Sequence, residues 1–209
     1  MSVMNKLSHS LGRRDEVPNQ ELAKELATTE NRTGIQEIVE GLKSGDKKTQ
    51  SDCIKVLYEI GYINPDLIAE YVDDFLKLLR NRNNRLVWGS MIALATIAEI
   101  KAAELYENRD EILRAIEKGS VITVDNGIKT LATIASVKAE YRRELFPYLL
   151  DHLANCRPKD VPQRAEKIVV AVDSDNKQQF IEVLETRMSI MKPSQVKRLQ
   201  KVKQKAEKQ

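Results

Sequence analysis

The chain has 209 residues, of which 42% are apolar, and it carries a net charge of +3. It is therefore long and apolar enough to bury a core, which excludes a wholly disordered polymer. Charged residues make up 31% of the chain and aromatic residues only 5%, a balance typical of amphipathic helices rather than of sheets.

The same composition bears on the compartment. No stretch of 18 successive apolar residues occurs, and no apolar run follows Arg13 and Arg14, so we expect neither a membrane span nor a secretory signal. The two cysteines, Cys53 and Cys156, lack the spacing of metal ligands, and a secreted chain would usually carry more cysteines in a disulfide pattern. Both are predicted to be reduced thiols of a cytoplasmic protein.

The first predicted element is a helix over residues 18–28. Residues 1–17 contain no helical apolar pattern and are expected to be disordered. Leu22, Ala23, Leu26 and Ala27 then form one apolar stripe with charged residues outside it. This pattern predicts a helix that caps the structure after it.

From residue 35 to residue 172 an apolar pattern returns every 37 residues. One series has apolar residues at positions i, i+3 and i+6, which is the inward face of an α-helix. Its four copies are Ile54, Leu57 and Ile60; Met91, Leu94 and Ile97; Ile128, Leu131 and Ile134; and Ala165, Ile168 and Ala171. We call these predicted helices the B helices.

A second series with the same period precedes each B helix. Its copies are Ile38, Val39 and Leu42; Phe75, Leu76 and Leu79; Ile112, Leu113 and Ile116; and Leu149, Leu150 and Leu153. Such a wide stripe predicts an A helix that packs on its own B helix and on the next repeat. Polar turns at 44–46, 82–84, 118–120 and 157–159 separate the two, so the unit is helix, turn, helix.

The pattern thins toward the C-terminus. Phe180 and Leu184 indicate a fifth A helix, and Pro193 begins a last helix with a narrow apolar stripe. Residues 192–209 hold seven basic side chains and one acidic one, so they carry +6 and the preceding residues carry −3. We assign residues 18–191 to one repeat domain and residues 192–209 to a basic capping helix or tail.

Residues 42–61 and 79–98 resemble the HEAT repeat of the short bacterial and archaeal type. Asp46 follows the polar turn, and Val87, Val124 and Val161 share the column where that family usually has a valine. The resemblance covers about residues 35–172 and implies an all-α fold, a right-handed α-α superhelix of about four helix pairs with capping helices. At the position where the family usually has an arginine, the four successive repeats instead have Ser51, Trp88, Asp125 and Pro162.

Catalysis is not expected. A nucleophile, a histidine and an orienting acid are the usual set, but His9 lies in the expected disordered start and His152 on a repeat helix, where a surface or packing role is the better interpretation. No glycine-rich phosphate loop or metal-ligand spacing occurs. We therefore predict a non-enzymatic scaffold with no cofactor, no metal and no small-molecule substrate.

The predicted partner is another protein. Trp88 begins the second B helix, close to Arg82 and Arg85, and Asp125 occupies its column one repeat later. Trp88 either packs between repeats or anchors a partner, since tryptophan and arginine are common in binding hot spots.

Nucleic-acid binding is the alternative, with kinship to HEAT-like DNA glycosylases as a remote form of it. Its candidate phosphate contacts are Lys47, Lys48 and Arg80 in the turns and Lys197, Arg198 and Lys201 in the basic segment. Basic turns form phosphate-binding ridges in some helical-repeat proteins, although turns also carry basic residues simply because they are solvated.

Overall fold

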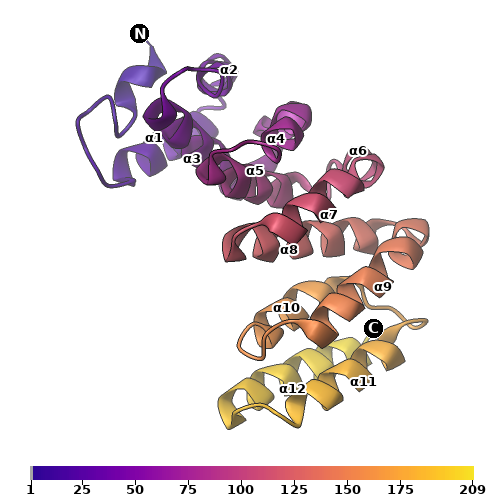
Figure 1. Ribbon diagram of the computed structural model, residues 1–209. Helices are drawn as coiled ribbons and strands as arrows, with labels where there is room; N and C mark the ends of the chain where they lie inside the picture. The colour runs from indigo at the N-terminus through magenta and orange to yellow at the C-terminus, as the bar shows by residue number, and fades with distance from the viewer. Residues whose placement is uncertain (1) are drawn as a thin grey trace. The chain divides into compact units, whose positions relative to one another are not determined.

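The computed structural model describes residues 2–209, which form helices and connecting turns with no strand among them (Figure 1). The chain divides into two compact units, Met1–Gly127 and Ile128–Gln209, and helix α8 (Val121–Val137) contributes residues to both. The predicted all-α class is confirmed. No helix of the described residues has the length and apolar character needed to span a membrane.

The first unit consists of two layers of helices. Helices α1, α3 and α5 lie side by side in one layer, while α2 packs on α3 and α4 packs on α5 (Figure 1). Its elements are η1 (Val3–Lys6), α1 (Val17–Thr28), α2 (Arg32–Gly41), α3 (Lys47–Ile63), η2 (Pro65–Leu67), η3 (Ala69–Tyr71), α4 (Val72–Leu78), α5 (Asn84–Ile97), α6 (Ala102–Glu107) and α7 (Arg109–Lys118), followed by the first part of α8. Helices α3 and α5 are the first two predicted B helices.

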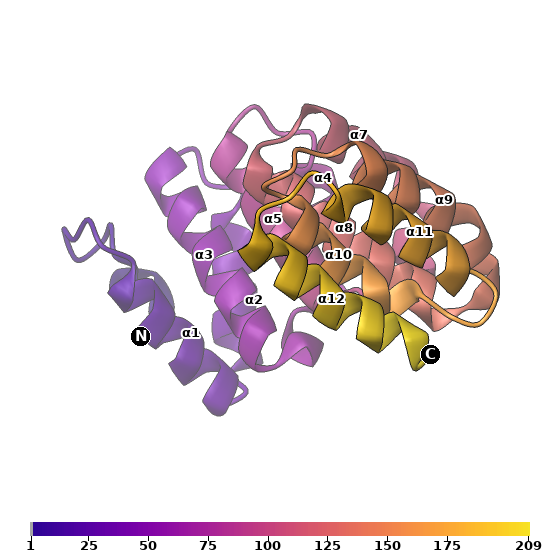
Figure 2. The same ribbon diagram turned by 90° about the horizontal axis from the view of Figure 1, so that it is seen from below.

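The second unit repeats the helix-pair plan. After the end of α8 it contains α9 (Ala139–Asn155), α10 (Val161–Ile168), η4 (Val169–Ala171), α11 (Lys177–Met188) and α12 (Pro193–Glu207). Helix α9 packs on α10 and α11, and α12 packs on α10 and α11. Figures 1 and 2 both show α11 and α12 side by side.

The predicted apolar stripes form the core. Every residue of the four B stripes is buried. The A stripes are buried as well, except Leu113 and Leu150, which are half-buried. These two lie at the edge of a wide stripe, where a neighbouring helix covers only part of the side chain. The 37-residue period therefore marks the buried face of each helix pair.

The N-terminal segment differs from the prediction. We expected residues 1–17 to be disordered; residue 1 lies outside the described residues, but Val3 and Leu7 are buried and η1 packs on α1 and α2. The backbone N–H of Ser8 donates to the side chain of Asn19, which is itself buried. A single 3-10 turn with two apolar residues gives no periodic pattern, so the sequence carries little warning of this packing.

The basic C-terminal segment is a helix with a packed apolar stripe. Leu199, Val202 and Ala206 of α12 are buried. Arg198 donates to Glu166 at 2.9 and 2.6 Å, and the ammonium of Lys203 lies 2.6 Å from Glu185. Helix α12 thus packs its apolar stripe on α10 and α11.

Two glycines let α3 and α5 approach closely. A Cβ atom at Gly61 of α3 would collide with Thr96 of α5, and one at Gly89 of α5 would lie 2.7 Å from the side chain of Ile54. Larger residues at these positions would separate the helices. This close approach brings the outward side chains of α3 and α5 into contact.

Truncating a buried leucine of the B stripe should destabilise the unit that contains it. We expect Leu94→Ala and Leu131→Ala each to lower the free energy of unfolding by about 2–5 kcal/mol, because a buried leucine leaves a cavity when it is removed. Chemical denaturation monitored by circular dichroism measures the change. Ile100→Ala is the matched control, because Ile100 is 44% exposed and surface changes usually stay within about 0.5 kcal/mol. Equal effects at all three positions would contradict the assigned core.

Candidate partner-binding surface

Helix α3 carries a second stripe beside the core stripe, buried at Lys55 and Tyr58 and exposed at Tyr62. Lys55, Tyr58 and Tyr62 follow one another at intervals of three and four residues, so they share one face of the helix. Tyr58 is 5% exposed and Tyr62 is 56% exposed. Their rings lie edge to face, with centroids 6.1 Å apart, an arrangement that aromatic pairs prefer.

Trp88 of α5 extends this stripe across to the neighbouring helix. Its ring centroid lies 6.1 Å from that of Tyr58, and the guanidinium of Arg85 lies 5.5 Å from the indole ring. Trp88 is half-buried, so it packs on the preceding repeat and still presents part of its ring to solvent. We call Tyr58, Tyr62, Arg85 and Trp88 the aromatic cluster.

The buried side chain of Lys55 packs against the Tyr58 ring of the aromatic cluster. The Lys55 side chain is 7% exposed, and its ammonium lies 2.6 Å from Glu59, 2.9 Å from Glu16 and 4.9 Å from the centre of the Tyr58 ring. Burial alone would lower the pKa of Lys55, but hydrogen bonds to Glu59 and Glu16 outweigh it and raise the pKa. Lys55 is therefore charged, and it holds the two carboxylates and the tyrosine together.

Glu16 joins this lysine to the aromatic cluster. It immediately precedes α1 and pairs with both Lys55 and Arg85. Partial burial would raise the pKa of Glu16, but the hydrogen bond and charge of Lys55 and the charge of Arg85 hold it below the ordinary value of 4.5. The carboxylate thus fixes the guanidinium that lies over Trp88.

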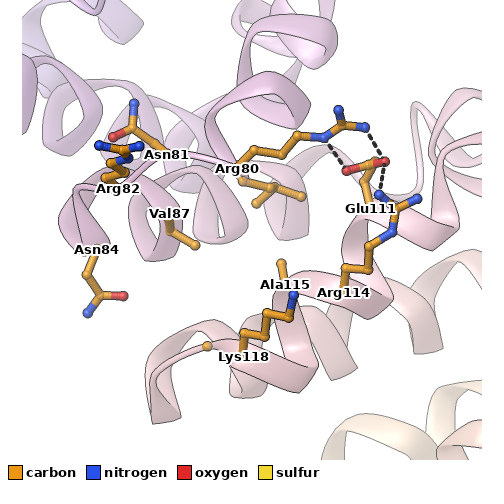
Figure 3. A pocket seen from close by; sticks show the side chains of 11 residues that line it. Arg80, Asn81, Arg82, Asn84, Val87, Glu111, Arg114, Ala115 and Lys118 are labelled. Carbon is orange, nitrogen blue, oxygen red and sulfur yellow. Dashed lines mark hydrogen bonds and ion pairs between the residues drawn. The ribbon is translucent and has the colours of Figure 1, made fainter.

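A basic cleft of about 460 Å³ lies in the same unit, between the α4–α5 turn and α7. Figure 3 shows Arg80 and Arg114 converging on Glu111 at one end of the cleft, with Arg82 and Asn84 on the opposite wall. Leu79, Val87 and Ala115 add apolar surface, and Lys118 is the fourth basic residue of the lining. We call this the basic cleft.

Glu111 neutralises only part of this charge. Arg80 Nε donates to it at 2.6 Å with a second bond from the same guanidinium, and Arg114 Nη1 lies 3.1 Å away. The hydrogen bond and charge of Arg80 lower the pKa of Glu111, whose side chain is only 15% exposed. Across the described residues, Arg82 and Lys118 have no ion-pair partner. Four cations and one carboxylate leave an excess of three positive charges.

The predicted site residues therefore fall into separate places. Trp88 and Arg85 belong to the aromatic cluster, whereas Arg80 and Arg82 line the basic cleft. Lys47 and Lys48 line another cleft, formed with the N-terminal segment, and Arg85 of the aromatic cluster lines this cleft as well. Asp125 is half-buried on α8 and interacts with other residues of the chain. The second unit holds the rest, of which Lys197 and Lys201 are exposed and Arg198 is paired with Glu166.

The thiols and histidines lie outside both sites. Burial raises the pKa of Cys53 to about 12, and burial also raises that of Cys156, so neither thiol is activated. His152 stacks on Tyr148, with centroids 6.3 Å apart. Over residues 2–209 no group of three or more acidic, histidine or cysteine side chains is placed to hold a metal ion.

Sequence reasoning missed half of each site. Lys55 looks like a solvent-facing lysine, and Glu16 lies far from it in the chain. Arg114 reaches the basic cleft from an A helix, and Lys118 ends that helix instead of lying in the turn predicted at 118–120. A stripe of Lys55, Tyr58 and Tyr62 beside the core stripe was the available signal for the first site.

Comparison with known proteins supports the fold. No protein-family model matches the sequence, and no curated protein sequence matches it. An engineered protein of known crystal structure aligns with 100% of this chain and 98% of its own at a TM-score of 0.68 and 19% identity. A designed armadillo repeat protein in complex with the peptide (KR)4 aligns over 90% and 86% at a TM-score of 0.68 and 17% identity.

Designed armadillo repeat proteins for modular peptide recognition also match, at a TM-score of 0.64 and 16% identity over 91% of this chain and 94% of theirs. At these identities the likeness defines the class of fold, which is the α-helical repeat solenoid of the armadillo type in general.

The ion pairs of Glu16 predict a specific loss of stability in acid. The carboxylate contributes stability fully above its ordinary pKa of 4.5 and loses it as the pH falls through its lower folded pKa. We therefore expect Glu16→Gln to be less stable than the wild type at neutral pH. This difference in stability should shrink as the pH falls below 4.5. Urea denaturation at a series of pH values measures it. Glu21→Gln, an exposed change on α1, should show no such convergence, and a constant difference for Glu16→Gln would contradict the assignment.

Proposed function

We propose that this chain is a non-enzymatic scaffold that binds a segment of a partner protein across α3 and α5, with the aromatic cluster as the anchor. The observation that supports this most is the placement of Tyr62 and Trp88. Both are large rings that an ordered helix pair leaves partly exposed, on a face that the core does not need. Tyrosine, tryptophan and arginine are the residues most enriched in protein-binding hot spots.

The support of the cluster favours binding over mere packing. Lys55 and Glu16 hold the rings and the Arg85 guanidinium in one arrangement before any ligand arrives, and a preorganised surface loses less entropy on binding. Apolar rings beside paired charges suit a peptide with both apolar and polar side chains. Solved proteins of the same fold class bind a peptide or are designed to recognise peptides. This supports a peptide segment as the partner.

Two further proposals concern the type of repeat and the cellular compartment. We propose a HEAT-type repeat, on the valine column and the polar turns of the sequence, acting in the cytoplasm without cofactor or catalysis. Trp88 stands where the family usually has an arginine, and the part of its ring that does not pack on the preceding repeat is available to a partner.

Trp88 is the only tryptophan of the chain, so its fluorescence reports on this site directly. The immobilised chain would first capture proteins from nuclease-treated lysate of the source cells, and peptides tiled from the captured proteins would then be titrated against the free chain. We expect one peptide to shift the emission saturably. Tyr62→Ala and Arg85→Gln should each weaken that binding about tenfold or more, as loss of a hot-spot side chain does.

Ile190→Ser is the control, since Ile190 is 64% exposed and lies in the other unit. Circular dichroism checks that all variants remain folded. Binding that survives both cluster variants, or capture that occurs only from lysate not treated with nuclease, would contradict the proposal.

A further inference from the structure

The basic cleft contains side-chain donors and positive charges that have no acceptor within the described residues, and none of them belongs to the aromatic cluster. Arg80 is engaged by Glu111 through two bonds, while Arg114 offers only one nitrogen to the same carboxylate. Arg82 and Lys118, in the part of the chain that the structure describes, donate to no side chain. The Oδ1 atom of Asn81 accepts from the N–H of Asn83 at 2.8 Å, which leaves its NH₂ group as a further donor.

These donors surround a space of defined size. The cleft has a volume of about 460 Å³, within the range of small-ligand sites, and Figure 3 shows that its basic side chains come from the α4–α5 turn on one side and from α7 on the other. Leu79, Val87 and Ala115 line it between the charges. An occupant with an anionic head and an apolar stem would match both features.

We propose that the basic cleft binds the phosphate group of a phosphorylated side chain on a protein partner. A phosphate monoester carries about −1.5 to −2 charge at neutral pH and three acceptor oxygens. It therefore neutralises an excess of three positive charges more fully than a ligand with a single carboxylate would. Guanidinium groups recognise it through charge-assisted hydrogen bonds. The inference rests on the proposed function only for its partner class, since the cleft and the aromatic cluster share no residue.

The charge distribution favours a single phosphate over a nucleic-acid backbone. Residues before 192 carry a net charge of −3, which disfavours a long polyanion. The other predicted phosphate contacts of this unit, Lys47 and Lys48, line a different cleft together with Arg13, Arg14 and Arg85, of which Arg13 is paired with Asp15 and Arg85 with Glu16. Duplex binding usually needs several phosphate contacts along a continuous track.

The test uses the full chain labelled with ¹⁵N and two small probes, O-phospho-L-serine and L-serine. We expect phosphoserine to shift the backbone amide signals of residues 81–87 and 115–119 saturably, and serine to leave them in place. Arg82→Gln and Lys118→Gln should each weaken binding about tenfold, because each removes a charge-assisted hydrogen bond. Lys118→Arg should retain it. Lys197→Gln, an exposed change on α12, should have no effect.

Each other outcome overturns the proposal. Shifts that are absent, or that persist in both glutamine variants, would remove the phosphate site. An oligonucleotide that shifts the same amides and is not displaced by phosphoserine would assign the cleft to nucleic acid. Because Tyr62→Ala leaves the cleft intact, a failure here is distinguishable from a failure of the peptide-binding proposal, which the Trp88 emission reports separately.

Discussion

One helix pair of this sequence cannot bury its own apolar surface, and that constraint organises the structure. Each A helix carries a stripe too wide for a single partner, and each B helix presents residues such as Leu57 and Leu94 that are fully buried only when neighbouring helices cover them. Since burial of apolar area is the main favourable term in folding, the pairs must stack. The constant period of 37 residues keeps successive stripes facing one another.

Stacking also decides what remains available for function. Packing occupies one side of α3 and α5, and Gly61 and Gly89 draw these helices together. Tyr58 of α3 then lies against Trp88 of α5, and Glu16, which precedes α1, pairs with Lys55 of α3. A buried lysine is expensive to desolvate unless it is paired, so the two carboxylates around Lys55 are a condition for this arrangement. The face proposed for binding is thus a consequence of the same contacts that build the core.

The sequence predicted the periodic part of this structure and little of the rest. Positions such as Leu94, Leu131 and Ile168 follow from spacing alone, because a period carries its own register. Glu16 and Arg85 could not be paired in the same way, since they are far apart in the chain and meet only after folding. The order of residues 2–16 escaped prediction for a related reason: two apolar side chains in a 3-10 turn make no pattern.

The central claim is that a partner lies on the face of α3 and α5 that carries the aromatic cluster. Hydroxyl-radical footprinting of the chain, alone and with its captured partner, tests this directly, because oxidation of tyrosine and tryptophan follows their exposure to solvent. We expect the partner to protect Tyr62 and Trp88 and Tyr148 on α9 to be oxidised equally in both states. Protection confined to the second unit, with Tyr62 and Trp88 oxidised as in the free chain, would contradict it.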